Sequence, residues 1–112
     1  MLLVSSFFEN VERDGRNAVL HFIPRPAQTM LVACVYSVWK SPVDDRSLLS
    51  FAAITDEPPA EVAAAGHDRM IVSLKPEHVE RWLDPAGASL SQLQAILADR
   101  QAPYYEHEVL AA

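Results

Sequence analysis

The sequence is poor in cysteine and glycine, and it has no long hydrophobic run. A single cysteine, Cys34, excludes an internal disulfide framework and a zinc site built from several cysteines. No apolar run approaches the roughly 20 residues that a membrane-spanning helix needs. The apolar opening MLLVSSFF lacks the basic segment and the small-residue cleavage site of a signal peptide. We therefore expect a cytoplasmic protein.

Positive charge is also scarce. The chain has 15 acidic and 9 basic residues, a formal net charge of −6, which argues against a uniformly basic nucleic-acid binder. A local basic patch remains open, because an electric field depends on the arrangement of charges as well as on their sum. Half of the residues are apolar and 21% are charged, as in ordinary globular proteins. The length of 112 residues predicts one domain, residues 1–112.

The first half of the chain has the pattern of β-structure. An Asp-Gly pair within residues 13–16 predicts a hairpin turn. The run 29–39 is so rich in β-branched and aromatic residues that we expect a central strand rather than an exposed edge. Other strands are predicted at 2–8, 17–25 and 48–55.

The second half mixes helices and strands. Gly66 suits the end of a short helix that opens with two prolines, and Ser89 with Gln92 fits a capping box at the start of a later helix. A further helix is predicted at 76–83, and strands at 69–74 and 104–110. The predicted fold class is α+β, with an antiparallel β core and helices late in the chain.

Two residues are candidates for proton transfer. Glu9 follows two aromatic residues at an expected strand end, where partial desolvation would raise the pKa of its carboxyl group. The alternative is a loop-facing glutamate, which the residues alone favour. His67 lies between a predicted helix end and a buried strand, and a helix end stabilises an imidazolium ion. A capping histidine satisfied by the last helix carbonyls fits equally well.

Other polar residues give weaker signals. Asp68 and Arg69 could form a local ion pair, and Arg69 could instead bind a phosphate or lie free on the surface. Cys34 has no charged neighbour in the sequence, so we expect a buried core cysteine. The segment YEHEVL favours a polar edge strand over a metal site, since strand neighbours point to opposite faces. His21 and His78 are expected to be structural or exposed.

Two stretches of the chain resemble the SOS response-associated peptidase (SRAP) family of abasic-site processing proteins. FFEN at residues 7–10 is similar to the FYEW segment of that family. Residues 50–85, SFAAITDEPPAEVAAAGHDRMIVSLKPEHVERWLDP, are similar to its later signature with the core HDRMP. The second match is the more specific one, because it is long and contains an unusual motif. Together the two matches span most of the chain.

The resemblance implies an antiparallel β-barrel-like sheet with a few peripheral helices, of which this chain covers the C-terminal part. It implies binding of single-stranded DNA and a covalent crosslink to abasic sites, with autopeptidase activity in the family and no metal or cofactor. Glu9 and His67 would move protons during Schiff-base formation and release. Arg69, together with Thr55, would contact DNA phosphates.

The chain departs from the family pattern at several positions. The family's nucleophile is a cysteine exposed after removal of the initiator methionine, whereas residue 2 here is Leu2 and Cys34 falls in a core strand. Asn10 and Ile71 replace the usual tryptophan and proline. The upstream half of the family has no counterpart, which predicts self-association or a missing N-terminal half. The alternatives to a crosslinking enzyme are a non-catalytic module that binds DNA or a partner, and an inactive remnant.

Overall fold

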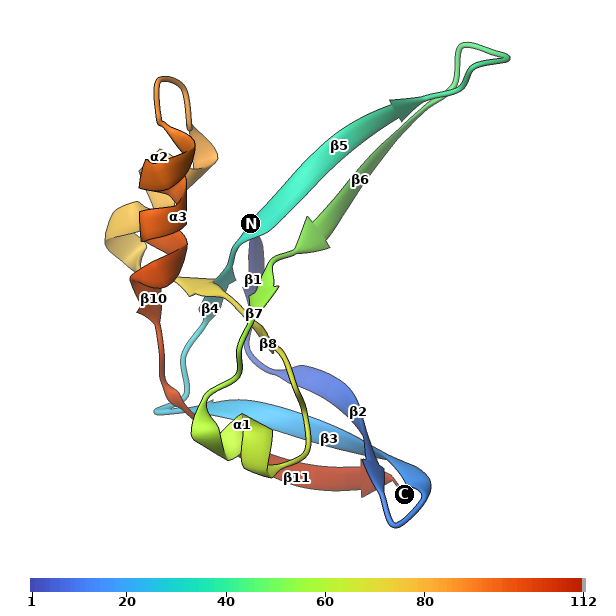
Figure 1. Ribbon diagram of the computed structural model, residues 1–112, viewed down its shortest axis with the longest axis vertical. Coiled ribbons are helices and arrows are strands. Elements are labelled where there is room, and N and C mark those ends of the chain that lie inside the picture. Colours follow the sequence, from blue (N-terminus) through green and yellow to red (C-terminus); the bar gives the residue numbers. More distant parts are fainter. Residues whose placement is uncertain (112) are drawn as a thin grey trace.

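The computed structural model describes residues 1–111 and consists mostly of antiparallel β-structure. Short helices lie in the second half of the chain, so the predicted α+β class is confirmed. The molecule is open in outline, with extents of 46 × 39 × 22 Å. A sheet with one covering helix, a pair of packed helices and a long hairpin extend in different directions from a central crossing of short strands (Figure 1).

A three-stranded sheet forms the better-packed part of the molecule. Its strands are β2 (Phe7–Arg13), β3 (Arg16–Arg25) and β11 (Tyr104–Ala111), in the order β11-β3-β2. The predicted Asp-Gly turn joins β2 to β3, with positive φ at both Asp14 (52°) and Gly15 (72°), as a two-residue hairpin turn of type I′ requires. The buried side chains of this core include Val11, Ala18, Leu20, Phe22, Val62 and Tyr105.

The predicted strand 2–8 is two strands in different sheets. β1 (Leu2–Val4) pairs with β4 (Met30–Val32), whereas β2 begins at Phe7 and pairs with β3. The expectation that Glu9 marks a strand end is therefore wrong. Continuous apolar character concealed the change of partner, because a run of apolar residues does not indicate which strand it will pair with.

Short strands form the central crossing. β1 and β4 continue into β9 (Ser73–Leu74) and β10 (Arg100–Gln101) in one four-stranded sheet. β7 (Thr55–Asp56) pairs separately with β8 (Met70–Ile71). The predicted strand 69–74 is thus divided between two sheets. α1 (Ala60–Ala64) precedes it and covers the inner face of the three-stranded sheet (Figure 1).

The remaining helices pack together beside the crossing. A 3₁₀ turn, η1 (Pro76–His78), leads into α2 (Val79–Leu83), and α3 (Leu90–Ala98) follows. The predicted capping box is confirmed, because the Ser89 hydroxyl accepts from the backbone N–H of Gln92 and the Gln92 side chain accepts from that of Ser89. None of the helices described in residues 1–111 is long and apolar enough to cross a membrane.

A two-stranded hairpin, β5 (Cys34–Lys40) with β6 (Ser47–Ala53), projects from the crossing as a free arm (Figure 1). The prediction that residues 29–39 form a central strand is wrong beyond Ala33, because no third strand or second layer covers this hairpin within the described residues. The prediction of a buried core cysteine is also wrong, because Cys34 is half-buried.

Candidate acid-base and DNA-contact site

Glu9 and His67 come together although 58 positions separate them. His67 Nε2 lies 3.0 Å from Glu9 Oε2. The side chains are 18% exposed for His67 and 30% exposed for Glu9, so the pair is sheltered but open to solvent on one side. A contact between a carboxylate and an imidazole in such a setting can hold and transfer a proton.

The alternation of β2 explains the position of Glu9. Phe7, Glu9 and Val11 lie on the same face of the strand, and Val11 is buried in the core. Glu9 stands opposite Leu20 of β3, which is fully buried. Its carboxylate is therefore held on the inward face of the sheet rather than turned to solvent, and the loop-facing alternative is not supported.

The loop after α1 brings His67 to Glu9. The helix is followed by Gly66, whose φ of +101° is a backbone conformation that side chains other than glycine rarely adopt. The backbone N–H of His67 then bonds to the carbonyl of Val62 at 3.3 Å. A Cβ on Gly66 would have ordinary contact with Val11 at 3.7 Å, so the backbone angle, not space, favours glycine here.

The hydrogen bonds of His67 restrict the protonation states of the pair. Nδ1 lies 2.7 Å from the carbonyl oxygen of Arg69, which can only accept, and 3.4 Å from the backbone nitrogen of Arg69. The shorter contact favours a proton on Nδ1. The contact between Nε2 and Glu9 then shares a single proton, either on an imidazolium facing a carboxylate or on a neutral carboxyl facing a neutral ring. Since Nδ1 contacts the Arg69 carbonyl and not the helix carbonyls, the helix-capping alternative is not supported for this side chain.

Arg69 is oriented by Thr55. Its Nε donates to Thr55 Oγ1 at 2.9 Å, and its Nη2 donates to the Thr55 carbonyl oxygen at 3.2 Å. The ion pair considered between Asp68 and Arg69 does not occur, as far as the described part of the chain extends. Arg69 remains exposed, and its fixed orientation leaves a guanidinium edge available to an anion.

A second arginine, Arg100, lies near Arg69 and Thr55, and no pattern in the sequence indicated it. Arg100 donates to Asp56, and this contact, with the backbone N–H of Glu57, holds the pKa of Asp56 below its usual value. The positive charge of Arg69 lowers that pKa further. Arg69 and Arg100 thus both act on Asp56, although the two arginines are 31 positions apart along the chain.

The other histidines have structural contacts, as predicted for His21 and His78. His21 stacks on Phe8 at 4.4 Å between ring centroids and contacts Glu108 at 2.9 Å. His78 contacts Asp99 at 2.8 Å, and Lys75 binds the same carboxylate. Lys75 and then His78 lower the pKa of Asp99. The strand that contains YEHEVL, β11, lies at the edge of its sheet, as predicted.

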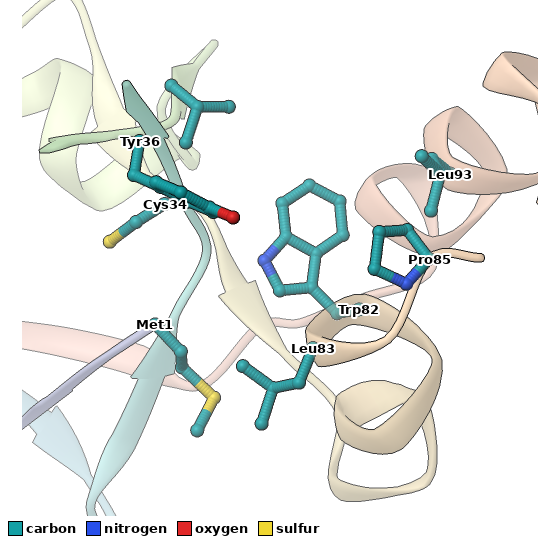
Figure 2. A pocket seen from close by; sticks show the side chains of 8 residues that line it. Met1, Cys34, Tyr36, Trp82, Leu83, Pro85 and Leu93 are labelled. Atoms are coloured by element: carbon teal, nitrogen blue, oxygen red, sulfur yellow. The ribbon is translucent and has the colours of Figure 1, made fainter. Parts of the chain in front are cut away.

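An apolar pocket of about 340 Å³ lies apart from the Glu9–His67 pair, between the base of β5 and the helices. Figure 2 shows Cys34 and Tyr36 on one side and Trp82, Leu83 and Pro85 on the other, with Met1 at the base. Apolar side chains dominate the lining, so the pocket provides packing surface rather than catalytic groups.

Comparison with known proteins identifies the fold. A crystal structure of a protein from Bacteroides thetaiotaomicron superposes with a TM-score of 0.76 at 18% identity, covering 96% of this chain and 47% of that one. A crystal structure of a protein from Bordetella bronchiseptica gives a TM-score of 0.73 at 15% identity, covering 99% of this chain and 54% of that one. The chain therefore spans about half the length of these structures.

No match is found among the curated proteins. The family model for the SOS response associated peptidase (SRAP) matches residues 1–111, which is nearly the whole chain. Because the match extends over nearly all of its residues, this chain belongs to the SRAP family.

Proposed function

We propose that this chain supplies the acid-base and DNA-contact groups of an abasic-site processing site on single-stranded DNA. The observation that carries the proposal is the 3.0 Å contact between His67 Nε2 and Glu9 Oε2. Family membership, with the chemistry that the resemblance implies, supports the choice of substrate. Condensation of an amine with a sugar aldehyde needs both an acid and a base, and this pair can act as either.

Proton movements in the reaction match the single proton that the pair shares. When an amine attacks the aldehyde carbon, a C–N bond forms, the nitrogen gives up one proton and the carbonyl oxygen takes one, which leaves a carbinolamine. Loss of water then requires a second proton on that oxygen and removal of one from nitrogen, giving the Schiff base. The side chain of Glu9 is more exposed than that of His67, so we assign the direct transfers to Glu9. His67, fixed by the Arg69 carbonyl, holds and returns the proton.

Arg69 would bind the phosphate beside the abasic sugar. Thr55 fixes two of its donor groups, so little side-chain entropy remains to be lost when the guanidinium meets an anion. Arg100, already paired with Asp56, keeps the neighbouring carboxylate from repelling the DNA backbone.

The attacking group is assigned to a different polypeptide segment. The sole cysteine of the sequence, Cys34, lies in β5 away from the Glu9–His67 pair. Free cysteine carries both an amine, which can attack the sugar aldehyde, and a thiol, which can then close a thiazolidine ring. Added to the reaction, it can therefore test the acid-base roles of Glu9 and His67 without the family's own nucleophile.

The test supplies free cysteine as that nucleophile. The chain is mixed with abasic single-stranded DNA and cysteine, and thiazolidine formation is followed by mass spectrometry. We expect the chain to accelerate the reaction. Glu9→Gln or His67→Ala should lower the rate about a hundredfold. If the wild-type acceleration is less than that, each variant should remove all of it. Glu12→Gln and His78→Gln are matched controls outside the pair and should retain the wild-type rate.

A result that contradicts the proposal is equal acceleration by wild type and by both pair variants, or no acceleration at all. Denaturing electrophoresis tests the assignment of the nucleophile. The chain alone with abasic DNA should give no covalent band. A covalent band that persists in Cys34→Ala would show that another group of this chain attacks the sugar.

A second candidate function is a non-catalytic module that binds single-stranded DNA. The fixed orientation of Arg69 favours it, because this arrangement serves binding without any chemistry. It predicts salt-sensitive binding that weakens in Arg69→Ala, with the salt slope reduced by about one phosphate contact. Arg81→Ala, which removes an arginine bound to the Ala86 carbonyl, is the control. Affinity that ignores both salt and Arg69→Ala would exclude this function.

A further inference from the structure

One face of the β5–β6 hairpin is apolar along most of its length. Cross-strand pairing places Tyr36 opposite Phe51 and Val38 opposite Leu49, and partners directly opposite in a hairpin share a face. These four side chains are 77%, 62%, 53% and 66% exposed, in the order named. We call these four residues the Tyr36 face. Contiguous apolar surface of this kind marks an interaction site.

Within the described residues no third strand pairs with the hairpin, and other elements approach it only at its base. An isolated two-stranded hairpin is marginally stable in water, and a covering layer is normally needed. The radius of gyration, 16.6 Å, also exceeds the roughly 13 Å of a compact domain of this length. The hairpin and the three-stranded sheet extend in different directions from the central crossing (Figure 1).

The Tyr36 face continues into apolar pockets at the base of the hairpin. One pocket is lined in part by Tyr36, Cys34 and Trp82, as seen in Figure 2. A second, of about 260 Å³, shares Tyr36 and Cys34 and adds Phe51 and Leu2. The face and the pockets therefore form one surface from the tip half of the hairpin to the helices.

The length of the solved relatives indicates what covers this surface. The matches cover 96% and 99% of this chain, so the hairpin belongs to the shared fold, yet they cover 47% and 54% of the relatives. We infer that the Tyr36 face and its pockets bind the complementary half of the SRAP fold. This occupant would present an apolar surface and would not be strongly acidic. A second copy of this chain is disfavoured, since each copy carries a charge of −6.

This inference deepens the proposed function, since the complementary half would also bring the attacking group to Glu9 and His67. Docking and catalysis can nevertheless fail separately. Docking is measured without DNA, and the acceleration of free cysteine is measured without the complementary half.

The experiment uses hydrogen exchange and sedimentation. The probe is the part of the Bordetella bronchiseptica protein outside the match, produced as a separate polypeptide, with the corresponding part of the Bacteroides thetaiotaomicron protein as a second probe. In the chain alone, we expect amides of β5 and β6 to exchange far faster than those of β3. With either probe in excess, we expect a one-to-one complex in which exchange of β5 and β6 slows by at least about tenfold.

A matched pair of variants keeps the test specific. Leu49→Ser removes a side chain of the Tyr36 face, and Leu90→Ser removes an equally large side chain that is 72% exposed on α3. We expect Leu49→Ser to weaken the complex at least tenfold and Leu90→Ser to leave it unchanged.

Two results would overturn the inference. One is exchange in β5 and β6 that neither probe slows. The other is a stable dimer of the chain alone that Leu49→Ser dissociates, which would make a second copy the occupant.

Discussion

The three-stranded sheet and the β5–β6 hairpin are built from similar residues but differ in burial. In β3, alternate side chains are buried, and Leu20 and Phe22 are fully inaccessible. In β5 and β6, apolar side chains of the same types are more than half exposed. The sheet has a third strand and α1 to cover its inner face, whereas the hairpin has neither.

The difference shows that burial follows from what packs against a strand, not from the apolar character of the strand. It also explains where the candidate site lies. Glu9 and His67 are held on the packed side, where a buried sheet face and a short helix fix their positions. The hairpin contributes no side chain to the contacts of this pair, and its exposed apolar face serves the proposed docking instead.

The largest expected effect comes from removing the same side chain in each region. Leu20→Ala should lower the free energy of unfolding by roughly 2–5 kcal/mol, because a fully buried leucine leaves a cavity. Leu49→Ala should change it by less than about 0.5 kcal/mol, because Leu49 is already 66% exposed. Urea unfolding followed by circular dichroism measures both.

Equal losses for the two variants would end the contrast between the regions. They would mean that Leu49 is buried in solution, whether by association or by closure of the hairpin onto the sheet. Repeating the unfolding at several protein concentrations separates these explanations, since only association makes stability depend on concentration.

Local signals in the sequence were sufficient for much of the fold. The Asp14-Gly15 turn and the Ser89 capping box were predicted because each depends on residues within a few positions of one another. The role of the run 29–39 could not be predicted, because its apolar pattern does not say whether another layer lies over it. The division of the run 2–8 was missed for the same reason, since pairing partners are distant in the sequence.

A smaller effect is expected from replacing Gly66, and it distinguishes the positioning of His67 from a general loss of stability. Gly66→Ala places a side chain at φ +101° and should cost about 1–3 kcal/mol. It should also displace His67, which changes the imidazole resonances of His67 in NMR spectra. Gly87→Ala is the control, because Gly87 has φ +73° with open space around its Cα and lies away from the site.

Both glycine variants should lose stability, but only Gly66→Ala should alter the His67 resonances. If Gly87→Ala alters them equally, the change reports general loosening of the fold. If neither does, Gly66 does not position His67.

The residues of the candidate site could be named from the sequence, but their contacts with one another could not. The resemblance pointed to Glu9, His67, Thr55 and Arg69, and residue chemistry alone left Glu9 and His67 with structural alternatives. Their contacts depend on the pairing of β2 with β3 and on the chain reversal at Gly66, which no short pattern reveals. Arg100 was missed because its contact with Asp56 spans 44 positions.

The smallest effect at neutral pH concerns the core tyrosine. Burial, followed by the negative charge of Glu61, raises the pKa of Tyr105 to about 12 from its ordinary value of 10.0. Its hydroxyl has Met30 Sδ as a weak acceptor at 3.6 Å, so Tyr105→Phe should cost less than about 1 kcal/mol near pH 7.

The folded state therefore favours the neutral phenol of Tyr105, and the sign of the pH dependence follows. The stability that the raised pKa contributes is fully present below pH 10 and is lost as the pH rises from about 10 to about 12. Tyr105→Phe should abolish this alkaline loss, whereas Tyr36→Phe, on the exposed hairpin, should leave it unchanged. Urea unfolding across that pH range measures the loss of stability. An alkaline loss that survives Tyr105→Phe would show that a group other than Tyr105 causes it.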